Sequence, residues 1–270
     1  MPEGHKTHYL AREHNRRYAG ERLEVSSPQG RFSEGANAVS GHVLESVRAS
    51  GKHLFYKFEG NRIVHIHLGR YGSYAEQTSP PKPPVGQVRL RMVSQTLTLD
   101  LRGPSQCRLI DRETQQSVLD SLGPDPLDGG DKAEVWAAIS KSSKPIGGLL
   151  LEQAVVAGVG NIFRAEVLFE TGLDPRLPGA KLSKIQFNEL WKSLVKMMKL
   201  GLKHGRIITV TAKEAGKPLK DLEDHERFRV YGKASCPRCD ANIVVESIAS
   251  RKMHWCPGCQ SGSQSAGQEC

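Results

Sequence analysis

The stretch Leu149-Leu150-Leu151-Glu152-Gln153-Ala154-Val155-Val156-Ala157-Gly158-Val159-Gly160-Asn161-Ile162-Phe163-Arg164 joins two apolar segments through a pair of glycines. A dinucleotide-binding turn is excluded, because the preceding run has a helical pattern and no third glycine follows at the required spacing. A helix, a tight turn and a second helix are typical of a relative of the helix-turn-helix. The first N–H groups of the second helix can bind an anion. Asn161 is then either a helix cap or a phosphate ligand.

Four cysteines near the C-terminus form two pairs, Cys236-Pro237-Arg238-Cys239 and Cys256-Pro257-Gly258-Cys259, separated by sixteen residues. This spacing predicts one structural Zn²⁺ held by four thiolates, with no open position for a substrate. Segments 243–245 and 253–255 are expected to form a hairpin between the pairs. Arg251 would lie at its tip, as a phosphate contact or a solvated surface charge.

The rest of the chain predicts an α+β protein of several domains. A helix is expected over 5–18 with a stop at Gly20, followed by strands at 43–47, 54–58, 63–68, 88–92 and 97–101 in a β-sandwich. Further helices are expected at 132–141, 146–156, 162–171 and 183–204, and a loop at 207–230. The predicted domains are a β-sandwich at 1–122, a linker at 123–130, a helical DNA-binding domain at 131–230, a zinc finger at 231–260 and a disordered tail at 261–270.

The overall charge favours a polyanionic partner. The 270 residues carry a net charge of +9 and a sequence pI of about 9.3, and release of phosphate counterions gives a basic protein affinity for DNA. No run approaches the roughly 20 apolar residues of a membrane span, and no apolar signal region opens the chain. We therefore expect a soluble, cytoplasmic protein with a polyanion as its partner.

Six features, in this order, resemble the formamidopyrimidine-DNA glycosylase/endonuclease VIII family of base-excision repair enzymes. They are the Pro-Glu-Gly start, the Gly51-Lys52 turn, Leu68-Gly69-Arg70-Tyr71-Gly72, Gly123-Pro124-Asp125-Pro126-Leu127, the Gln153 to Asn161 turn and the four-cysteine finger. The resemblance spans residues 1–260, and it implies a monomeric protein of bacterial type that acts on the nucleoid. The end of the finger is similar to the endonuclease VIII branch, which implies oxidised pyrimidines as substrates, with 8-oxoguanine and formamidopyrimidines as the alternative.

The resemblance implies a bifunctional DNA glycosylase and AP lyase with a helix-two-turn-helix. Pro2, exposed by removal of Met1, would attack C1′ of the damaged nucleotide and form an iminium (Schiff base) that drives β- and δ-elimination. An α-amine has a pKa of about 7.7–8.0, so a fraction of it is unprotonated at neutral pH. Glu3 would transfer protons and Lys52 would contact a phosphate near the lesion.

The remaining implied roles concern DNA. Asn161 and Arg251 would hold phosphates on either side of the everted nucleotide. Arg70 and Tyr71 would fill the gap that the nucleotide leaves, because a guanidinium plane and a phenol ring both stack on bases. Two exposed side chains on an ordinary hairpin turn are the alternative.

The sequence departs from the family at positions 5 and 6, where His5-Lys6 replace the usual Pro-Glu. The second acidic residue is therefore absent, and His5 or His8 is a candidate replacement in proton transfer. His65 and His67 are expected to be structural. A competing hypothesis is a non-catalytic DNA-binding zinc protein, for which Pro2-Glu3 and Lys52 have no role.

Overall fold

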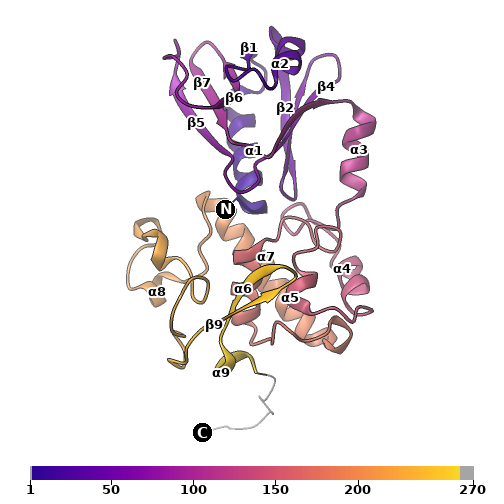
Figure 1. Ribbon diagram of the computed structural model, residues 1–270, viewed down its shortest axis with the longest axis vertical. Coiled ribbons are helices and arrows are strands. Elements are labelled where there is room, and N and C mark those ends of the chain that lie inside the picture. Colours follow the sequence, from indigo (N-terminus) through magenta and orange to yellow (C-terminus); the bar gives the residue numbers. More distant parts are fainter. Residues whose placement is uncertain (1, 262–270) are drawn as a thin grey trace. The chain divides into compact units, whose positions relative to one another are not determined.

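The structure is a computed structural model that describes residues 2–261, so the predicted tail lies outside the described residues from 262 on. The chain divides into two compact units, Met1–Ser121 and Leu122–Cys270, and each is described by itself (Figure 1). The architecture is α+β, as predicted. Within the described part, no helix has the length and apolar character needed to cross a membrane.

The first unit is a single antiparallel sheet with a leading helix. Its helices are α1 (Gly4–Tyr18), α2 (Ser33–Val39) and α3 (Arg112–Asp120), and its strands are β1 (Arg22–Ser26), β2 (His42–Ser50), β3 (His53–Phe58), β4 (Arg62–His67), β5 (Ser73–Thr78), β6 (Val88–Val93), β7 (Leu97–Arg102) and β8 (Gln106–Ile110). The strand order is β5-β7-β6-β1-β2-β3-β4-β8.

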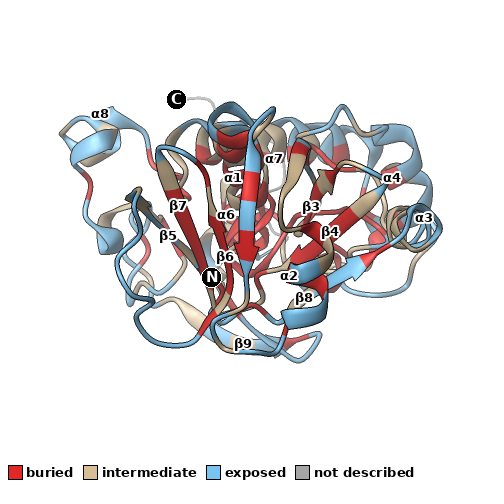
Figure 2. Cartoon of the chain, turned by 90° about the horizontal axis from the view of Figure 1, so that it is seen from above, coloured by how far each residue is buried: buried red, intermediate tan, exposed pale blue. Residues whose placement is uncertain are grey.

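Strand β1 folds this sheet into two layers. Its first residues pair with β2 at Arg22↔Val43, whereas its last pair with β6 at Ser26↔Arg91. Side chains from both halves, such as Tyr56 of β3 and Leu101 of β7, enter one core that Leu10 of α1 also joins. Figure 2 shows β6 and β7 in the buried colour along most of their length. The strands therefore enclose a sandwich-like core, and α1 packs against β2 and β3.

Helix α1 closely matches the helix predicted at 5–18. Glu3 occupies the N-cap position and Ala19 the C-cap position, and Gly20 follows with a φ of +87°. Arg16 and Arg17 lie in the last turn, where cations interact favourably with the helix dipole. With Glu3 as its N-cap, the helix begins directly after Glu3.

The second unit is mainly helical. Its helices are α4 (Lys132–Ile139), α5 (Ile146–Leu149), α6 (Asn161–Glu170), α7 (Lys184–His204), α8 (Ala212–Ala215) and α9 (Pro257–Gln260), with 3-10 turns η1 (Gly179–Lys181), η2 (Leu219–Asp221) and η3 (Asp224–Glu226) and strands β9 (Val244–Ile248) and β10 (Arg251–Trp255). One apolar cluster joins the helices to the hairpin, from Val135 through Phe163 and Leu194 to Trp255. The segment predicted as a linker belongs to this unit, since Gly123 N–H donates to Gln153 O over 2.8 Å.

The helix predicted at 146–156 is wrong in length. Helix α5 ends at Leu149. The chain then turns through hydrogen bonds from an N–H to the carbonyl three residues earlier, such as Leu151 N–H to Gly148 O and Val155 N–H to Glu152 O. Gly147 and Gly148 weaken the helix. The side chains of Leu149, Leu150, Val155 and Val156 are buried by tertiary contacts instead. An apolar run that is buried on all sides carries no periodicity to mark the end of the helix.

The segment expected as a loop at 207–230 is anchored to α6 through one buried carboxylate. Glu166 accepts hydrogen bonds from Thr209 Oγ1 at 2.6 Å, from Arg229 N at 2.9 Å, and from the backbone N–H groups of Val230 and Tyr231 at 2.9 and 2.8 Å. The side chain of Glu166 is completely buried. The two carboxylate oxygens of Glu166 therefore hold the start of this segment at Thr209 and its end at Arg229–Tyr231.

Glu166→Gln is expected to lower the free energy of unfolding by about 3 kcal/mol. The amide nitrogen of glutamine would have to face N–H donors on one side or the other, so buried donors would lose their acceptor. Urea unfolding followed by fluorescence measures this. Glu170→Gln, at the partly exposed end of the same helix, is the control and should cost less than about 1 kcal/mol. Equal effects of the two variants would contradict the anchoring role.

Candidate functional site

The chain start and the Gly51-Lys52 turn lie together at one edge of the first unit. Thr7 Oγ1 is 2.6 Å from Gly51 O and 2.8 Å from Gly4 O, so its hydroxyl ties the first turn of α1 to this turn. Gly51 has a φ of +54°, which favours glycine. Glu3 is completely buried, whereas Pro2 and Lys52 are half-buried. Pro2, the buried carboxylate of Glu3 and Lys52 are thus carried on adjoining segments of the first unit.

The residues that replace the usual Pro-Glu occupy different environments. His5 is buried and His8 is half-buried. Partial burial lowers the pKa of Lys6, and its ammonium lies 5.0 Å from the centre of the Tyr9 ring. Lys6 therefore occupies the position of the second carboxylate that the resemblance leads one to expect. Of the two histidines, His5 is buried and His8 is partly exposed to solvent.

The loop 68–72 is a tight turn that presents two large side chains. A Cβ on Gly72 would lie 2.3 Å from Leu68 O, and Gly69 has a φ of +63°, so both glycines are required by the turn. Gly69 N–H donates to His67 Nδ1 over 3.1 Å. Tyr71 is 75% exposed, and the Arg70 guanidinium lies 5.4 Å from its ring centre. The turn thus projects a stacked cation and ring into solvent.

In the second unit, the side chain of Gln153 closes the turn before α6. Its amide nitrogen donates to Leu151 O and Val159 O over 2.9 and 3.0 Å, and its oxygen accepts from Gly158 N–H at 3.0 Å. Gly158 has a φ of +85°. The Gln153 side chain therefore satisfies backbone groups on both sides of this turn, which have no helical partner, and it fixes the turn from which α6 begins.

Asn161 does not cap α6, since Gly160 is at the cap position and Asn161 is the first residue of the helix. Its Nδ2 donates to Lys252 O over 2.8 Å, and its Oδ1 accepts from Arg164 Nε at 3.0 Å. These bonds join the start of α6 to the hairpin. They bring Asn161 and Arg251, 90 positions apart in the chain, to one surface of the second unit.

Arg164 holds α5, α6 and the β9–β10 hairpin together, and the sequence analysis did not single it out. Its guanidinium is completely buried and donates to Gly147 O at 2.8 Å, Ile248 O at 3.1 Å and Arg251 O at 3.1 Å. Arginine supplies five N–H donors in a rigid fork, which suits several carbonyls at once. An arginine and a glutamate within the apolar run of α6 were the available signal for Arg164 and Glu166.

We expect Arg164→Lys to lower the free energy of unfolding by about 2–4 kcal/mol, because an ammonium cannot reach carbonyls on α5 and on both sides of the hairpin. Hydrogen exchange of the β9 and β10 amides should accelerate. Arg238→Lys is the matched control, since Arg238 also joins α6 to the finger but is 41% exposed. An unaltered exchange rate in Arg164→Lys would show that the guanidinium does not hold the hairpin.

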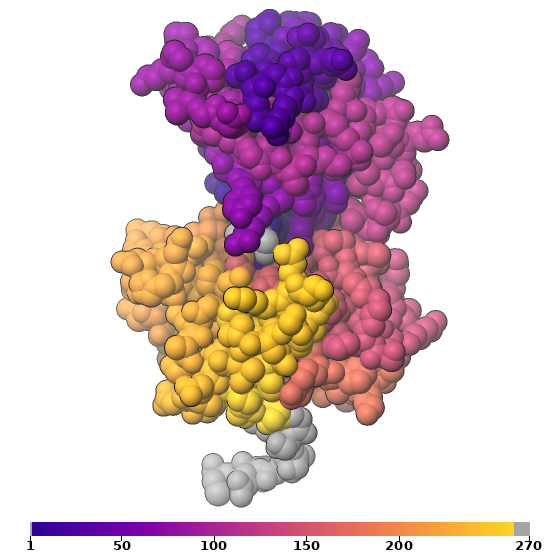
Figure 3. All heavy atoms as spheres, viewed as in Figure 1, coloured from indigo at the N-terminus to yellow at the C-terminus, as the bar shows by residue number. Residues whose placement is uncertain are grey.

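The hairpin turn consists of Ala249 and Ser250, which both have positive φ, +53° and +59°. Two such residues between paired positions Ile248 and Arg251 form a two-residue hairpin loop that matches the strand twist. Arg251 begins β10 and is exposed. Figure 3 shows this hairpin, in yellow, adjoining the orange segment before it, where Tyr231 packs on His254 with ring centres 4.6 Å apart.

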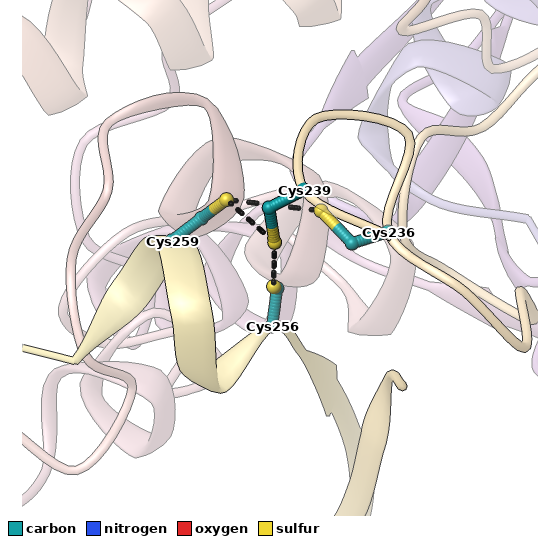
Figure 4. Close-up of side chains that lie close together, drawn as sticks. All are labelled: Cys236, Cys239, Cys256 and Cys259. Atoms are coloured by element: carbon teal, nitrogen blue, oxygen red, sulfur yellow. Dashed lines mark hydrogen bonds between the residues drawn. The ribbon is translucent and has the colours of Figure 1, made fainter. Parts of the chain in front are cut away.

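The four cysteines of the predicted finger lie together, with all their sulfur atoms within 4.8 Å of one another. Figure 4 shows Cys236 and Cys239 on the turn before β9 and Cys256 and Cys259 at α9, with their sulfurs converging. Three of the Sγ–Sγ distances are 3.7, 3.5 and 3.5 Å. Zn–S bonds of about 2.3 Å in a tetrahedron require sulfurs about 3.8 Å apart. The cluster therefore fits a metal ion of this kind.

Comparison with known proteins agrees with these observations. Residues 1–111 match the model of the formamidopyrimidine-DNA glycosylase N-terminal domain, and residues 122–213 match that of the formamidopyrimidine-DNA glycosylase H2TH domain. The chain is 44% identical over 267 residues to "Endonuclease 8 1" of Mycobacterium tuberculosis, which covers 96% of this chain and 100% of that protein. It is 31% identical over 249 residues to formamidopyrimidine-DNA glycosylase of Streptococcus thermophilus, covering 88% and 90%.

Solved structures show the same fold. Formamidopyrimidine-DNA glycosylase of Lactococcus lactis in complex with abasic-site DNA superimposes with a TM-score of 0.81 at 23% identity, covering 96% of this chain and 99% of that one. Its complex with DNA containing an oxidised pyrimidine gives 0.81 at 24% identity and the same coverage. At this identity the likeness is one of fold. Together with the 44% identical relative and the two matched domains, it establishes that the chain belongs to the formamidopyrimidine-DNA glycosylase/endonuclease VIII family.

Proposed function

We propose that this protein is a DNA glycosylase with AP lyase activity that removes oxidised pyrimidines. The observation that carries the proposal is the chain start, where Pro2 precedes a completely buried Glu3 at the first turn of α1, beside the turn that holds Lys52. A solvated surface helix has no need of a buried carboxylate at its cap. A carboxyl group placed here, next to the Pro2 nitrogen, suits a proton-transfer role.

In the proposed reaction, the Pro2 nitrogen bonds to C1′ and loses its proton as the bond between C1′ and the base breaks. The sugar ring then opens, O4′ takes up a proton, and an iminium joins C1′ to Pro2. Loss of a C2′ proton expels the 3′ phosphate, and a second elimination expels the 5′ phosphate. Water finally hydrolyses the iminium and restores the amine. Glu3 is the group proposed to transfer the proton at O4′ or at the base.

The other site residues would hold DNA. Lys52, Asn161 and Arg251 are proposed phosphate ligands, and Arg70 with Tyr71 is proposed to fill the gap after base eversion, which costs a few kcal/mol. The Nδ2 group of Asn161 has two hydrogens, so donation to Lys252 O leaves the second for a phosphate. Zn²⁺ bound to the four cysteines would stabilise the hairpin that carries Arg251 and would take no part in the chemistry.

The pyrimidine preference rests on the 44% identical relative, whose name is that of an endonuclease VIII. The 31% identical relative is named as a formamidopyrimidine-DNA glycosylase, so a purine-type specificity is the second candidate. The fold does not choose between them, because the Lactococcus lactis protein has been crystallised with a formamidopyrimidine lesion in one complex and with an oxidised pyrimidine in another.

The test is a panel of duplexes and single strands carrying thymine glycol, 5-hydroxycytosine, 8-oxoguanine, a formamidopyrimidine or an abasic site. We expect strand cleavage at the pyrimidine lesions and the abasic site, and a covalent protein–DNA adduct when borohydride is present. Faster cleavage of the purine lesions would reverse the assigned preference. Salt-sensitive binding of abasic DNA without cleavage or adduct would instead favour the non-catalytic zinc protein.

A further inference from the structure

One face of the sheet in the first unit carries three histidines, His53, His65 and His67, and an arginine in neighbouring positions of β3, β4 and β8. His65 of β4 pairs with Phe55 of β3 and with Arg108 of β8. Paired residues in an antiparallel sheet lie on the same face, and His53 is two positions from Phe55 on that face. Phe55 stacks on His65 with ring centres 4.8 Å apart, and His53 stacks on His65 at 5.1 Å.

The hydrogen bonds in this group run in one direction. Arg108 Nε, which can only donate, lies 3.4 Å from His65 Nδ1, so Nδ1 accepts and the proton of His65 is on Nε2. His65 Nε2 lies 2.8 Å from His53 Nδ1, which must then accept. The proton of neutral His53 is therefore on its outer nitrogen, Nε2. One charged donor thus determines the tautomer of two rings.

Both rings are held neutral. Burial is the main cause that lowers the pKa of His65 to about 3, with His53, Arg108 and His67 as further causes. Burial likewise lowers the pKa of His53 to about 4, together with the neighbouring His67, Arg108 and Lys52. A proton added to His53 would place a positive charge near His67, Arg108 and Lys52, which disfavours protonation. The half-buried His53 therefore offers Nε2–H as an uncharged donor.

This donor directly follows Lys52 in the chain, and no described residue accepts a hydrogen bond from it in the structure. We infer that His53 donates its Nε2–H to a DNA phosphate oxygen beside Lys52, and that His65 and Arg108 are positioning residues that keep the proton on that nitrogen. The inference rests on the proposed function, in which Lys52 contacts a phosphate. The inference adds a second hydrogen-bond donor, the uncharged His53, to the phosphate site proposed for Lys52.

A neutral donor differs measurably from a cation. Each phosphate that a cation neutralises contributes about 0.9 to the slope of log K against log salt for duplex DNA, because counterions are released. A hydrogen bond from an uncharged imidazole releases none. Loss of the His53 contact should therefore weaken binding while the salt slope stays the same, whereas loss of the Lys52 charge should reduce both.

The binding experiment uses the full chain and a duplex with an uncleavable tetrahydrofuran abasic analogue. His53→Phe, which keeps a ring for stacking, should raise Kd about tenfold, the effect of one hydrogen bond to a charged group. His53→Gln places an amide N–H near the position of Nε2 and should restore most of the affinity. His53→Asn reaches only the position of Nδ1 and should not. Thermal unfolding of each variant separates a binding defect from a folding defect.

The tautomer is tested directly by long-range ¹H–¹⁵N NMR of the histidine rings in the uncomplexed protein at neutral pH. We expect the Nε2–H form of His53, and a mixture of both tautomers in His65→Phe, accompanied by a smaller rise in Kd than in His53→Phe. A proton on Nδ1 of His53, an unaltered Kd in His53→Phe, or a lowered salt slope in that variant would each overturn the inference.

These readouts are independent of the reaction. If borohydride traps no adduct while the His53 variants behave as expected, the proposed lyase activity fails and the phosphate contact stands. If the wild-type protein is trapped on abasic DNA but the His53 variants bind like wild type, the proposed activity stands and the inference about His53 fails.

Discussion

A form of the protein that retains one additional residue before Pro2, such as Met1, is expected to lose AP lyase activity by roughly 10³-fold or more, and to give no borohydride-trapped adduct. The additional residue converts the Pro2 nitrogen into a tertiary amide, whose lone pair is delocalised into the carbonyl. Such a nitrogen has no nucleophilic lone pair and cannot form an iminium. The measurement is cleavage of an abasic duplex in single-turnover conditions, with gel analysis of the trapped complex.

The matched control is the same chain after the additional residue has been removed by a protease, which should recover both activity and adduct. The blocked form should still bind the tetrahydrofuran duplex, because the proposed phosphate ligands Lys52, Asn161 and Arg251 are unaltered. A blocked protein that is still trapped on DNA would place the nucleophile elsewhere. Lys6, whose pKa burial lowers, would then be the first residue to replace.

Cys256→Ser is expected to have the largest effect on structure. Cys256 is completely buried in the apolar cluster that joins the finger to the helices, and structural Zn²⁺ sites contribute apparent binding energies of about 10–16 kcal/mol. The variant should bind less than one Zn²⁺ per chain and lose protection of the β9 and β10 amides. Since Arg251 and the backbone partner of Asn161 lie on this hairpin, affinity for the tetrahydrofuran duplex should fall by about 10²-fold, the effect of two phosphate contacts.

Cys107→Ser is the control for that experiment. Cys107 lies in β8, outside the cluster, and burial raises the pKa of its thiol to about 12, so it remains protonated and is a poor metal ligand. This variant should retain one Zn²⁺ and full DNA affinity. Metal analysis of the two proteins, with and without a chelator, decides the outcome. A Cys256→Ser protein with one tightly held Zn²⁺ and an ordered hairpin would refute the four-cysteine site.

Local sequence patterns predicted much of the fold. Helix α1 follows from amphipathic spacing and the stop at Gly20, and β2, β3, β4, β6 and β7 follow from β-branched and aromatic runs between turn residues. Strand β5, Ser-Tyr-Ala-Glu-Gln-Thr, was missed because it is an edge strand with mainly exposed side chains, so that it has little apolar alternation. Helix α5 was predicted too long because its apolar continuation is buried in a turn.

By itself, the sequence determined the features that depend on neighbouring residues. The cysteine spacing brings pairs of thiols onto tight knuckles, the glycines at 69 and 72 define a turn, and Pro2 is next to Glu3 because they are consecutive. The tertiary structure decided which distant residues meet. Arg164 bonds to carbonyls 84 and 87 positions away, and His65 receives its hydrogen bond from Arg108, 43 positions away. Such contacts are set by how the elements pack, and a side chain that bonds to distant backbone carbonyls leaves no periodic trace in the chain.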